Sequence, residues 1–499
     1  MITALFFAAL LGAQDPQAPA PDWEAQGREA LAERLAVEPK TGPARNVILF
    51  IGDGMDITTI SAARILGGQK QGLSGEENVL GFETLPHTAL SKTYNTDMQT
   101  PDSAGTATAM LSGRKTRSGM LNVDQGVPRG DCEAARGAPL DTLADVAAAS
   151  ERSVGIVTTA RLTHATPASV YASAPERDWE SDADMPADSA CADIARQLLD
   201  RAEAINLKVA FGGGRSNFLP QDMADPEYED RTGRRMDGRN LVEAWNAMSR
   251  DNRFVWNEEG FEDLDPAAGG AVLGLFEPSH LRYEPDRQTE GADEPSLAEM
   301  TRFAIEKLDQ DEDGYFLMVE SGRVDHAHHA GNAARALEET LSLDEAVKAA
   351  LETVDLDETL ILVTADHGHT LSFAGYPQRG NPILGIVKSA DSDGEAVVRT
   401  GTDGRPYTTL GYANGPGALA VGAMGAADAP LLRPDLGDEQ AQHLDYRQQS
   451  LVPSPSETHG GQDVAVYAAG PGAYLVGGVL EQNVLYYVME HALTGAGTP

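Results

Sequence analysis

The chain has 499 residues, of which 38 are Lys or Arg and 77 are Asp or Glu, so its formal net charge at pH 7 is −39. This balance excludes a nucleic-acid-binding protein that works through a broad basic surface. Hydrophobic residues make up 41% of the chain, which is enough to bury a core and argues against disorder. At this length we expect two to four domains, or one large α/β body with insertions.

The first residues of the chain predict export. Residues 1–13 form an apolar run of signal-peptide length, and a stretch rich in Pro, Ala and Gln follows it to residue 21. No Lys or Arg precedes Arg28, so the usual positive start is missing, and a buried N-terminal segment is the alternative. No other segment has the roughly 18 uninterrupted apolar residues of a membrane span. We therefore predict that residues 1–21 are a signal peptide and linker, and that the protein is periplasmic or secreted.

The chain contains two cysteines, Cys132 and Cys191. In an exported protein an even number predicts one disulfide bond, whereas in a cytosolic protein it indicates two unrelated thiols. Because the first residues favour export, we favour the disulfide.

Apolar runs of strand length alternate along the chain with helical patterns, and several of the runs end in polar residues. In chain order, we expect strands at residues 46–51, 153–157, 315–319, 359–363 and 464–467. Helices are expected at residues 140–149, 191–201, 297–308, 332–354 and 482–493. This alternation predicts an α/β fold with a central, mostly parallel β-sheet and helices on both faces. Ligands of such sheets bind beyond the carboxyl ends of the strands.

Two stretches interrupt this alternation. Residues 222–293 are acidic and weakly periodic, and residues 372–455 are rich in Gly and turn-forming pairs. We interpret both as insertions on a single domain at residues 22–499.

Seven of the eleven histidines fall in four short clusters. A single histidine is more often structural, but repeated Asp and His residues at strand ends favour metal binding. Imidazole and carboxylate ligands together suit Zn²⁺, and further carboxylate and hydroxyl oxygens suit Mg²⁺. The clustered histidines are His164, His326, His328, His329, His367, His369 and His459. The carboxylates within these clusters belong to Glu320, Asp325, Asp366 and Glu457.

Spacing adds detail to this prediction. The interval from Glu320 through Asp325 to His329 lets one strand, loop and helix supply ligands to two ions. Asp366 and His367 are adjacent, so a loop that caps a strand can direct both at one ion.

Ser103 lies among small, helix-compatible residues and is expected at the start of a helix. It can be the N-cap, or a nucleophile at a helix N-terminus that favours an oxyanion. The residues alone leave both roles open.

Six motifs in this order resemble the signature set of alkaline phosphatases, with the closest likeness to the animal-type branch. The likeness runs from about residue 44 to residue 492. The motifs are Asp53 in IGDGM, Asp102-Ser103-Ala104, THATP at 163–167, VESGRVDHAHHAG at 319–331, VTADHGH at 363–369 and ETHGGQDVAVYAAGP at 457–471.

The resemblance implies a metal-dependent phosphomonoester hydrolase in an exported, bacterial protein, with Ser103 as the nucleophile that forms a phosphoserine. It also implies two Zn²⁺ and one Mg²⁺. The implied ligands are Asp325, His329 and His459 for one Zn²⁺, Asp53, Asp366 and His367 for the other, and Asp53, Thr166 and Glu320 for Mg²⁺.

Further residues take their implied roles from the same family. Arg177, 13 residues after His164, stands where the family places its phosphate-binding arginine. His164 and His326 stand at substrate-binding positions where animal-type enzymes have histidine. The family's ligands are phosphomonoesters and inorganic phosphate, and its members are commonly homodimers, which we adopt by analogy.

A calcium site is also implied by the resemblance. Glu227, Phe276 (through its carbonyl), Glu277 and Glu294 resemble the calcium-binding positions of animal-type enzymes. One extra residue before Glu294 disturbs that alignment, and solvated acids in an acidic insertion are the alternative.

Three alternative functions differ from this one in the residues that they require. A phosphodiesterase or nucleotide pyrophosphatase shares the metal scaffold but usually lacks the set of Thr166 and Glu320. A sulfatase needs a modified residue followed by x-Pro-x-Arg, which does not follow Ser103. A non-catalytic metal- or phosphate-binding protein is disfavoured because no expected site residue is missing.

Overall fold

The computed structural model describes residues 22–187, 189–418 and 433–495. The predicted signal peptide and linker, residues 1–21, lie outside the described residues. Among the helices described, none is long and apolar enough to cross a membrane.

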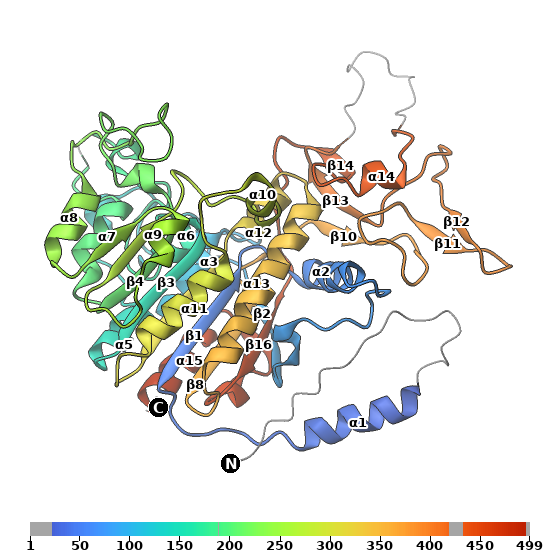
Figure 1. The fold of residues 1–499 in the computed structure, drawn as a ribbon, viewed down its shortest axis with the longest axis horizontal. Coiled ribbons are helices and arrows are strands. Elements are labelled where there is room, and N and C mark those ends of the chain that lie inside the picture. The colour runs from blue at the N-terminus through green and yellow to red at the C-terminus, as the bar shows by residue number, and fades with distance from the viewer. Residues whose placement is uncertain (1–21, 188, 419–432, 496–499) are drawn as a thin grey trace.

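A ten-stranded sheet forms the centre of the fold (Figure 1), in the order β17-β2-β16-β8-β1-β7-β3-β4-β6-β5. Neighbouring strands are parallel except where β16 pairs with β2 and β8. The predicted α/β fold with a mostly parallel sheet is therefore confirmed. The strands of this sheet are β1 (Asn46–Gly52), β2 (His87–Lys92), β3 (Ser153–Arg161), β4 (Leu207–Gly213), β5 (Arg253–Val255), β6 (Val272–Leu275), β7 (Tyr315–Ser321), β8 (Thr359–Ala365), β16 (Val464–Ala469) and β17 (Gly478–Glu481).

Strand β1 is buried along its whole length because both faces of the sheet are covered. Val47, Leu49 and Ile51 belong to one hydrophobic cluster, whereas Ile48 and Phe50 belong to another. Successive strand side chains point to opposite faces, so the two clusters are the cores on the two sides of the sheet.

Helices cover both cores. Residues of α5, α7 and α15 pack in the cluster that contains Val47, and residues of α11 and α13 pack in the other. Helix α11 begins where expected because Ser296 and Glu299 form a capping box at its start. The bounds of these helices are α5 (Leu143–Ala149), α7 (Ile194–Ala202), α11 (Leu297–Leu308), α13 (Ala333–Thr353) and α15 (Val484–Thr494). The other α-helices are α1 (Trp23–Leu35), α2 (Ile57–Lys70), α3 (Ser103–Ser112), α4 (Cys132–Ala135), α6 (Ala165–Ala168), α8 (Leu241–Met248), α9 (Glu258–Glu262), α10 (Glu284–Glu290), α12 (Arg323–His329) and α14 (Asp438–Ala441).

The carboxyl ends of the central strands lie together at one edge of the sheet. Gly52, the last residue of β1, is opposite Ser321 of β7 and Ala365 of β8. Asp53 and Asp366 are the next residues after β1 and β8. The register therefore brings together acidic residues that are more than 300 positions apart in the chain.

The two stretches interpreted as insertions have different structures. Residues 222–293 contain β5 and β6, which lengthen the central sheet beyond β4. These strands have three and four residues, too few to show a sequence period. The described residues of 372–455, which exclude 419–432, lie to one side of the sheet (Figure 1), where β13 pairs with β10 and β14, and β11 pairs with β12. The bounds here are β10 (Leu371–Phe373), β11 (Lys388–Ala390), β12 (Ala396–Val398), β13 (Leu410–Gly415) and β14 (Ser450–Pro453).

Cys132, the first residue of α4, is disulfide-bonded to Cys191. The two residues are 59 positions apart in the sequence. The bond thus closes a long loop that contains α5 and β3.

Replacing both cysteines with serine is expected to lower the free energy of unfolding by about 2–4 kcal/mol, because the bond restricts the unfolded chain. Denaturant unfolding under oxidising conditions measures this loss. The wild-type protein under reducing conditions is the matched comparison and should lose a similar amount. Unchanged unfolding curves for both would contradict a stabilising disulfide.

Candidate active site

Ser103 is the first residue of α3 and is 2% exposed. The N-cap is the preceding residue, Asp102, whose carboxylate accepts a hydrogen bond from the Gly105 N–H at 3.3 Å. The interpretation of Ser103 as the N-cap is therefore wrong. The Ser103 hydroxyl instead contacts a histidine. Ser103 Oγ lies 3.1 Å from His367 Nε2, at a helix N-terminus where backbone N–H groups favour an oxyanion.

Three side chains converge in a first metal-capable group. His329 Nε2 and His459 Nε2 are 3.1 Å apart, and each is 3.3 Å from Asp325 Oδ1. Ligands with bonds of 2.0–2.1 Å to a tetrahedral ion lie about 3.3 Å from one another, so these atoms fit one ion. Each ring directs Nδ1 at a main-chain oxygen, His329 at Glu457 (2.6 Å) and His459 at Pro101 (2.8 Å). This pairing leaves Nε2 available as the ligand atom.

Asp53, Asp366 and His367 form a second group, and all three are 0% exposed. His367 Nε2 lies 3.4 Å from Asp53 Oδ1 and 3.3 Å from Asp366 Oδ2. Burial lowers the pKa of His367 well below its usual value, so the ring is neutral and able to bind a metal ion. Because Ser103 Oγ faces the same nitrogen, the serine lies beside this group.

A third group contains oxygens that lack a hydrogen-bond partner among the described residues. They are both carboxylate oxygens of Asp53, Thr166 Oγ1 and Glu320 Oε1, all buried. Asp53, Glu320 and His164 also have ligand atoms within 4.8 Å of one another. Burial, then the charge of Asp366, raises the pKa of Asp53 well above its usual value, and burial raises the pKa of Glu320 to about 7. Such carboxylates are costly to bury alone, so the site fits divalent cations.

The structure gives His369 a role that the sequence did not reveal. His369 Nδ1 is 2.6 Å from Glu457 Oε2, and its Nε2 is 2.8 Å from Asp325 Oδ1. Burial opposes a charge on the ring, but bonds to Asp325 and Glu457 raise its pKa to about 10. The His369 ring therefore links Asp325 to Glu457. The ring fits closely against Gly54, which has φ of 70° and where a Cβ atom would be 2.4 Å from the ring.

Arg177 is positioned by the same carboxylate that caps α3. Its Nη1 donates to Asp102 Oδ2 at 3.1 Å, and its Nη2 lies 3.2 Å from His164 Nε2. Burial lowers the pKa of Arg177, but the charge and hydrogen bond of Asp102, together with nearby Asp53 and Asp178, raise the pKa above its usual value. The rings of His164 and His326 are 5.5 Å apart. The structure thus brings the three predicted substrate-binding residues next to one another, with Arg177 bonded to the residue before Ser103.

The residues of the predicted calcium site lie near one another but do not converge on one point. Glu277 adds to the effect of burial in raising the pKa of both Glu227 and Glu294, the latter to about 8. Phe276, which precedes Glu277 in the chain, is fully buried. Arg215 donates to Glu227 Oε2 at 2.7 Å, so an arginine already neutralises one carboxylate. Calcium binding remains a prediction.

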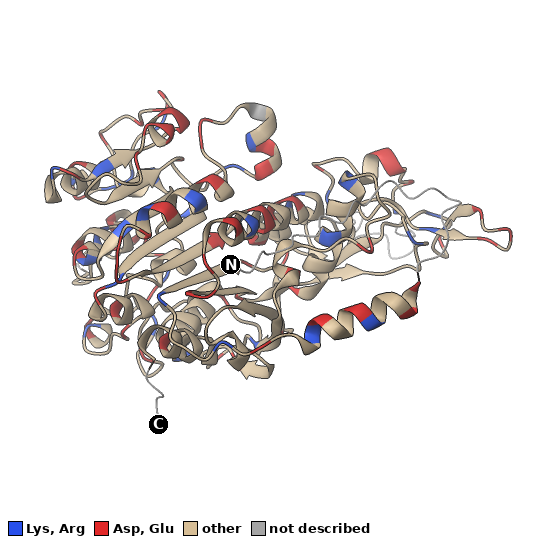
Figure 2. Ribbon diagram, turned by 60° about the horizontal axis from the view of Figure 1, so that its bottom comes forward, with Lys and Arg blue, Asp and Glu red and all other residues tan. Residues whose placement is uncertain are grey.

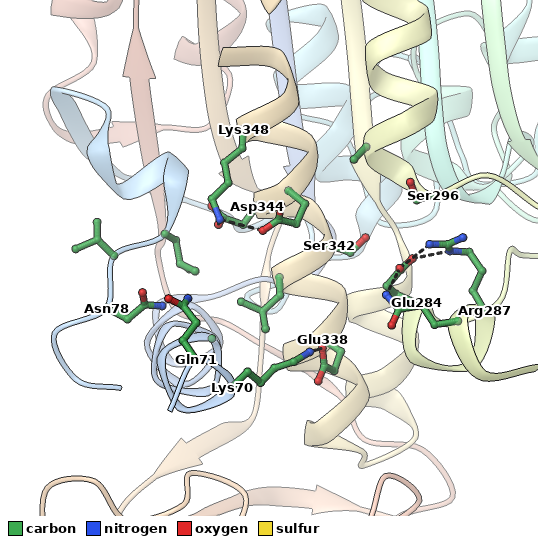
Figure 3. A pocket seen from close by; sticks show the side chains of 17 residues that line it. Lys70, Gln71, Asn78, Glu284, Arg287, Ser296, Glu338, Ser342, Asp344 and Lys348 are labelled. Atoms are coloured by element: carbon green, nitrogen blue, oxygen red, sulfur yellow. Dashed lines mark hydrogen bonds and ion pairs between the residues drawn. The ribbon is translucent and has the colours of Figure 1, made fainter. Parts of the chain in front are cut away.

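A cavity of about 420 Å³ lies elsewhere, lined by residues of α2, α10 and α13 (Figure 3). None of its lining residues belongs to the groups described above. Its cations are each paired with a carboxylate: Lys70 with Glu338, Arg287 with Glu284, and Lys348 with Asp344. We assign no ligand to it.

A buried serine at a helix start, an arginine and metal-capable groups at the carboxyl edge of a parallel sheet are typical of a metal-dependent hydrolase of anionic substrates. The family model described as alkaline phosphatase matches residues 44–494. The chain therefore belongs to the alkaline phosphatase family.

Individual relatives agree with this membership. The tissue-nonspecific alkaline phosphatase of Gallus gallus is 42% identical over 480 residues, covering 94% of this chain and 88% of that protein. The human tissue-nonspecific isozyme is 41% identical with the same coverage. The crystal structure of Thermus thermophilus alkaline phosphatase, at 24% identity, shares the fold with a TM-score of 0.64 and covers 96% of both chains.

Removing divalent ions with a chelator is expected to lower the free energy of unfolding by about 3 kcal/mol, the linkage effect for an ion supplied at one hundred times its dissociation constant. The reason is that Asp53, Asp366 and Glu320 then repel one another without compensation. Denaturant unfolding before and after chelation measures the loss, and added ions should restore it. Asp53→Asn should show a smaller loss because one buried charge is gone. An unchanged curve after proven removal of metal would contradict this prediction.

Proposed function

We propose that the chain hydrolyses phosphomonoesters with Ser103 as the nucleophile. The observation that carries the proposal is the place of Ser103 Oγ, 3.1 Å from His367 Nε2 at the start of a buried helix. Arg177 supports it, because Asp102 holds the guanidinium next to that serine. A guanidinium binds two phosphoryl oxygens at once.

The reaction proceeds in two displacements. Ser103 Oγ bonds to phosphorus while the bond to the ester oxygen breaks, and the alcohol leaves with a proton. A water oxygen then bonds to phosphorus, the bond to Oγ breaks, and Ser103 regains its proton as inorganic phosphate leaves. Arg177 holds the phosphoryl oxygens through both steps, with His164 and His326 as neutral hydrogen-bonding neighbours.

Two Zn²⁺ and one Mg²⁺ are the proposed cofactors. When bound, the ions supply positive charge that balances the buried carboxylates and favours the ionised form of Ser103. The proposed ligands are Asp325, His329 and His459 for one Zn²⁺, Asp53, Asp366 and His367 for the second, and Asp53, Thr166 and Glu320 for Mg²⁺. A further Ca²⁺ on Glu227, Phe276, Glu277 and Glu294 remains part of the proposal.

We also propose a cellular location, an oligomeric state and a domain organisation. Export to the periplasm or outside a bacterial cell is supported by the apolar first residues and by the disulfide, which suits an oxidising compartment. A homodimer is proposed by family analogy, and one catalytic domain with insertions at residues 222–293 and 372–455 is proposed from the sequence.

Ser103→Ala is expected to lower kcat for an aryl phosphate by about three orders of magnitude or more, because no other hydroxyl replaces the nucleophile. Ser112→Ala, at the other end of the same helix, is the matched control. The Ser112 Oγ donates to Thr108 O at 2.7 Å, and turnover of this variant should stay within about threefold of wild type. Near-normal turnover of Ser103→Ala would exclude the serine mechanism.

A comparison of an aryl phosphate with the corresponding diester separates the proposal from a phosphodiesterase. The monoester should be preferred in kcat/KM by at least about a thousandfold, because a second ester group competes for the space near Arg177 and costs one charged phosphoryl oxygen. Arg177→Ala should lower the ratio of monoester to diester kcat/KM, because the guanidinium group that distinguishes the two substrates is then missing. A higher kcat/KM for the diester in the wild-type protein would overturn the proposal that the protein hydrolyses phosphomonoesters.

A further inference from the structure

Glu180 is a buried carboxylate that the mechanism above does not use. It lies three residues after Arg177 and is 8% exposed. Its Oε2 accepts hydrogen bonds from Arg161 Nε at 2.7 Å, Thr163 Oγ1 at 2.5 Å and Asn217 Nδ2 at 3.2 Å, and its Oε1 accepts from Arg161 Nη2 at 2.5 Å. Both oxygens are therefore bound, and the charge is paired in the protein interior.

These contacts join two segments that approach the phosphate site from different parts of the fold. Arg161 is the last residue of β3, and Thr163 directly precedes His164 in the turn that leads to Thr166. Glu180 itself belongs to the segment that carries Arg177. One carboxylate thus fixes the position of the arginine segment relative to the turn of His164.

The network continues to the other substrate-side histidine. The His280 Nδ1 accepts a hydrogen bond from the Arg161 N–H at 3.2 Å, and the His280 Nε2 contacts Arg161 Nη1. The ring of His280 lies 4.1 Å from that of His326 and 5.5 Å from that of His164, measured between centroids. Arg161, held by Glu180, therefore supports the side of the site formed by the three imidazoles.

We propose that Glu180 is a positioning residue for phosphate binding, which sets the distance between Arg177 and His164 through Arg161 and Thr163. The inference rests on the proposed function, because it assigns the phosphate to Arg177. Without the carboxylate, Arg161 is left next to His280 and loses the acidic partner that the structure shows for it. The turn and the arginine segment then lose their common anchor, while the metal-capable groups keep their own hydrogen bonds.

The test compares Glu180→Gln with Glu284→Gln in the metal-loaded protein. Glu284 forms a bidentate pair with Arg287 at 2.8 Å, with side-chain exposures of 16% and 18%, whereas Glu180 and Arg161 have 11% and 22%. The two variants therefore remove similar glutamate–arginine pairs, one beside the phosphate site and one in α10. Binding of inorganic phosphate is measured by calorimetry, with kcat, KM, metal content and thermal unfolding recorded alongside.

Glu180→Gln is expected to weaken phosphate binding about tenfold and to raise KM by a similar factor, with kcat within about threefold and metal content unchanged. Glu284→Gln should leave phosphate binding as in wild type. Equal effects of the two variants on phosphate binding, or a fall in kcat and metal content without a change in phosphate affinity, would overturn the proposal.

Thr163→Val provides a milder second variant if Glu180→Gln does not fold. It removes one hydroxyl bond to Glu180 and should weaken phosphate binding by about threefold. Unchanged binding would count against the positioning role.

Failure of the proposed function can be distinguished from failure of this inference. A wild-type protein that binds phosphate but does not hydrolyse monoesters would refute the proposed function, whereas the effect of Glu180 on phosphate binding could still be measured.

Discussion

The crowding of buried carboxylates at one edge of the sheet is the constraint on which the rest of the site depends. Asp53, Glu320, Asp325 and Asp366 are each at most 4% exposed. Like charges so near one another in a protein interior are strongly unfavourable unless cations or hydrogen-bond donors balance them. The protein supplies part of this balance with His369 beside Asp325, and the groups around Asp53 are left for divalent ions.

The fold creates this crowding through the order of its strands. Parallel neighbours end at the same edge, so β1, β7 and β8 place their following residues side by side although they are far apart in the sequence. The apolar strands below are covered on both faces, which makes the edge rigid. A rigid support keeps the carboxylates together despite their repulsion and holds Ser103 against the second group.

The sequence was sufficient to predict the strands and helices that have long apolar segments, and the site residues that belong to ordered motifs. The central strands β1, β7 and β8 and helix α11 lie where the patterns placed them, because each is long and buried. Strands β5 and β6 are too short to show a sequence period. Helix α1 buries no residue, so it has no hydrophobic pattern to detect. The clustered Asp and His residues indicated metal binding, and the structure brings them together.

The remaining features depend on contacts between distant residues. The raised pKa of His369 arises from Asp325 and Glu457, which lie 44 and 88 positions away. Glu180 has no motif of its own, and its partners come from two separate segments, residues 161–163 and Asn217. The N-cap role of Ser103 stayed open in the sequence because Asp102 and Ser103 are adjacent and both residue types favour that position. Spacing alone does not distinguish them.

The main-chain acceptors of His329 and His459 make the orientation of these rings independent of side-chain identity. A carbonyl oxygen is present whatever residue occupies positions 457 and 101, so substitutions there change the side chain without deleting the acceptor. Position 101 also lies two residues before Ser103. Any movement of that short segment would shift Ser103 and the imidazole of His459 together. A single stretch of backbone therefore sets the position of these two side chains relative to each other.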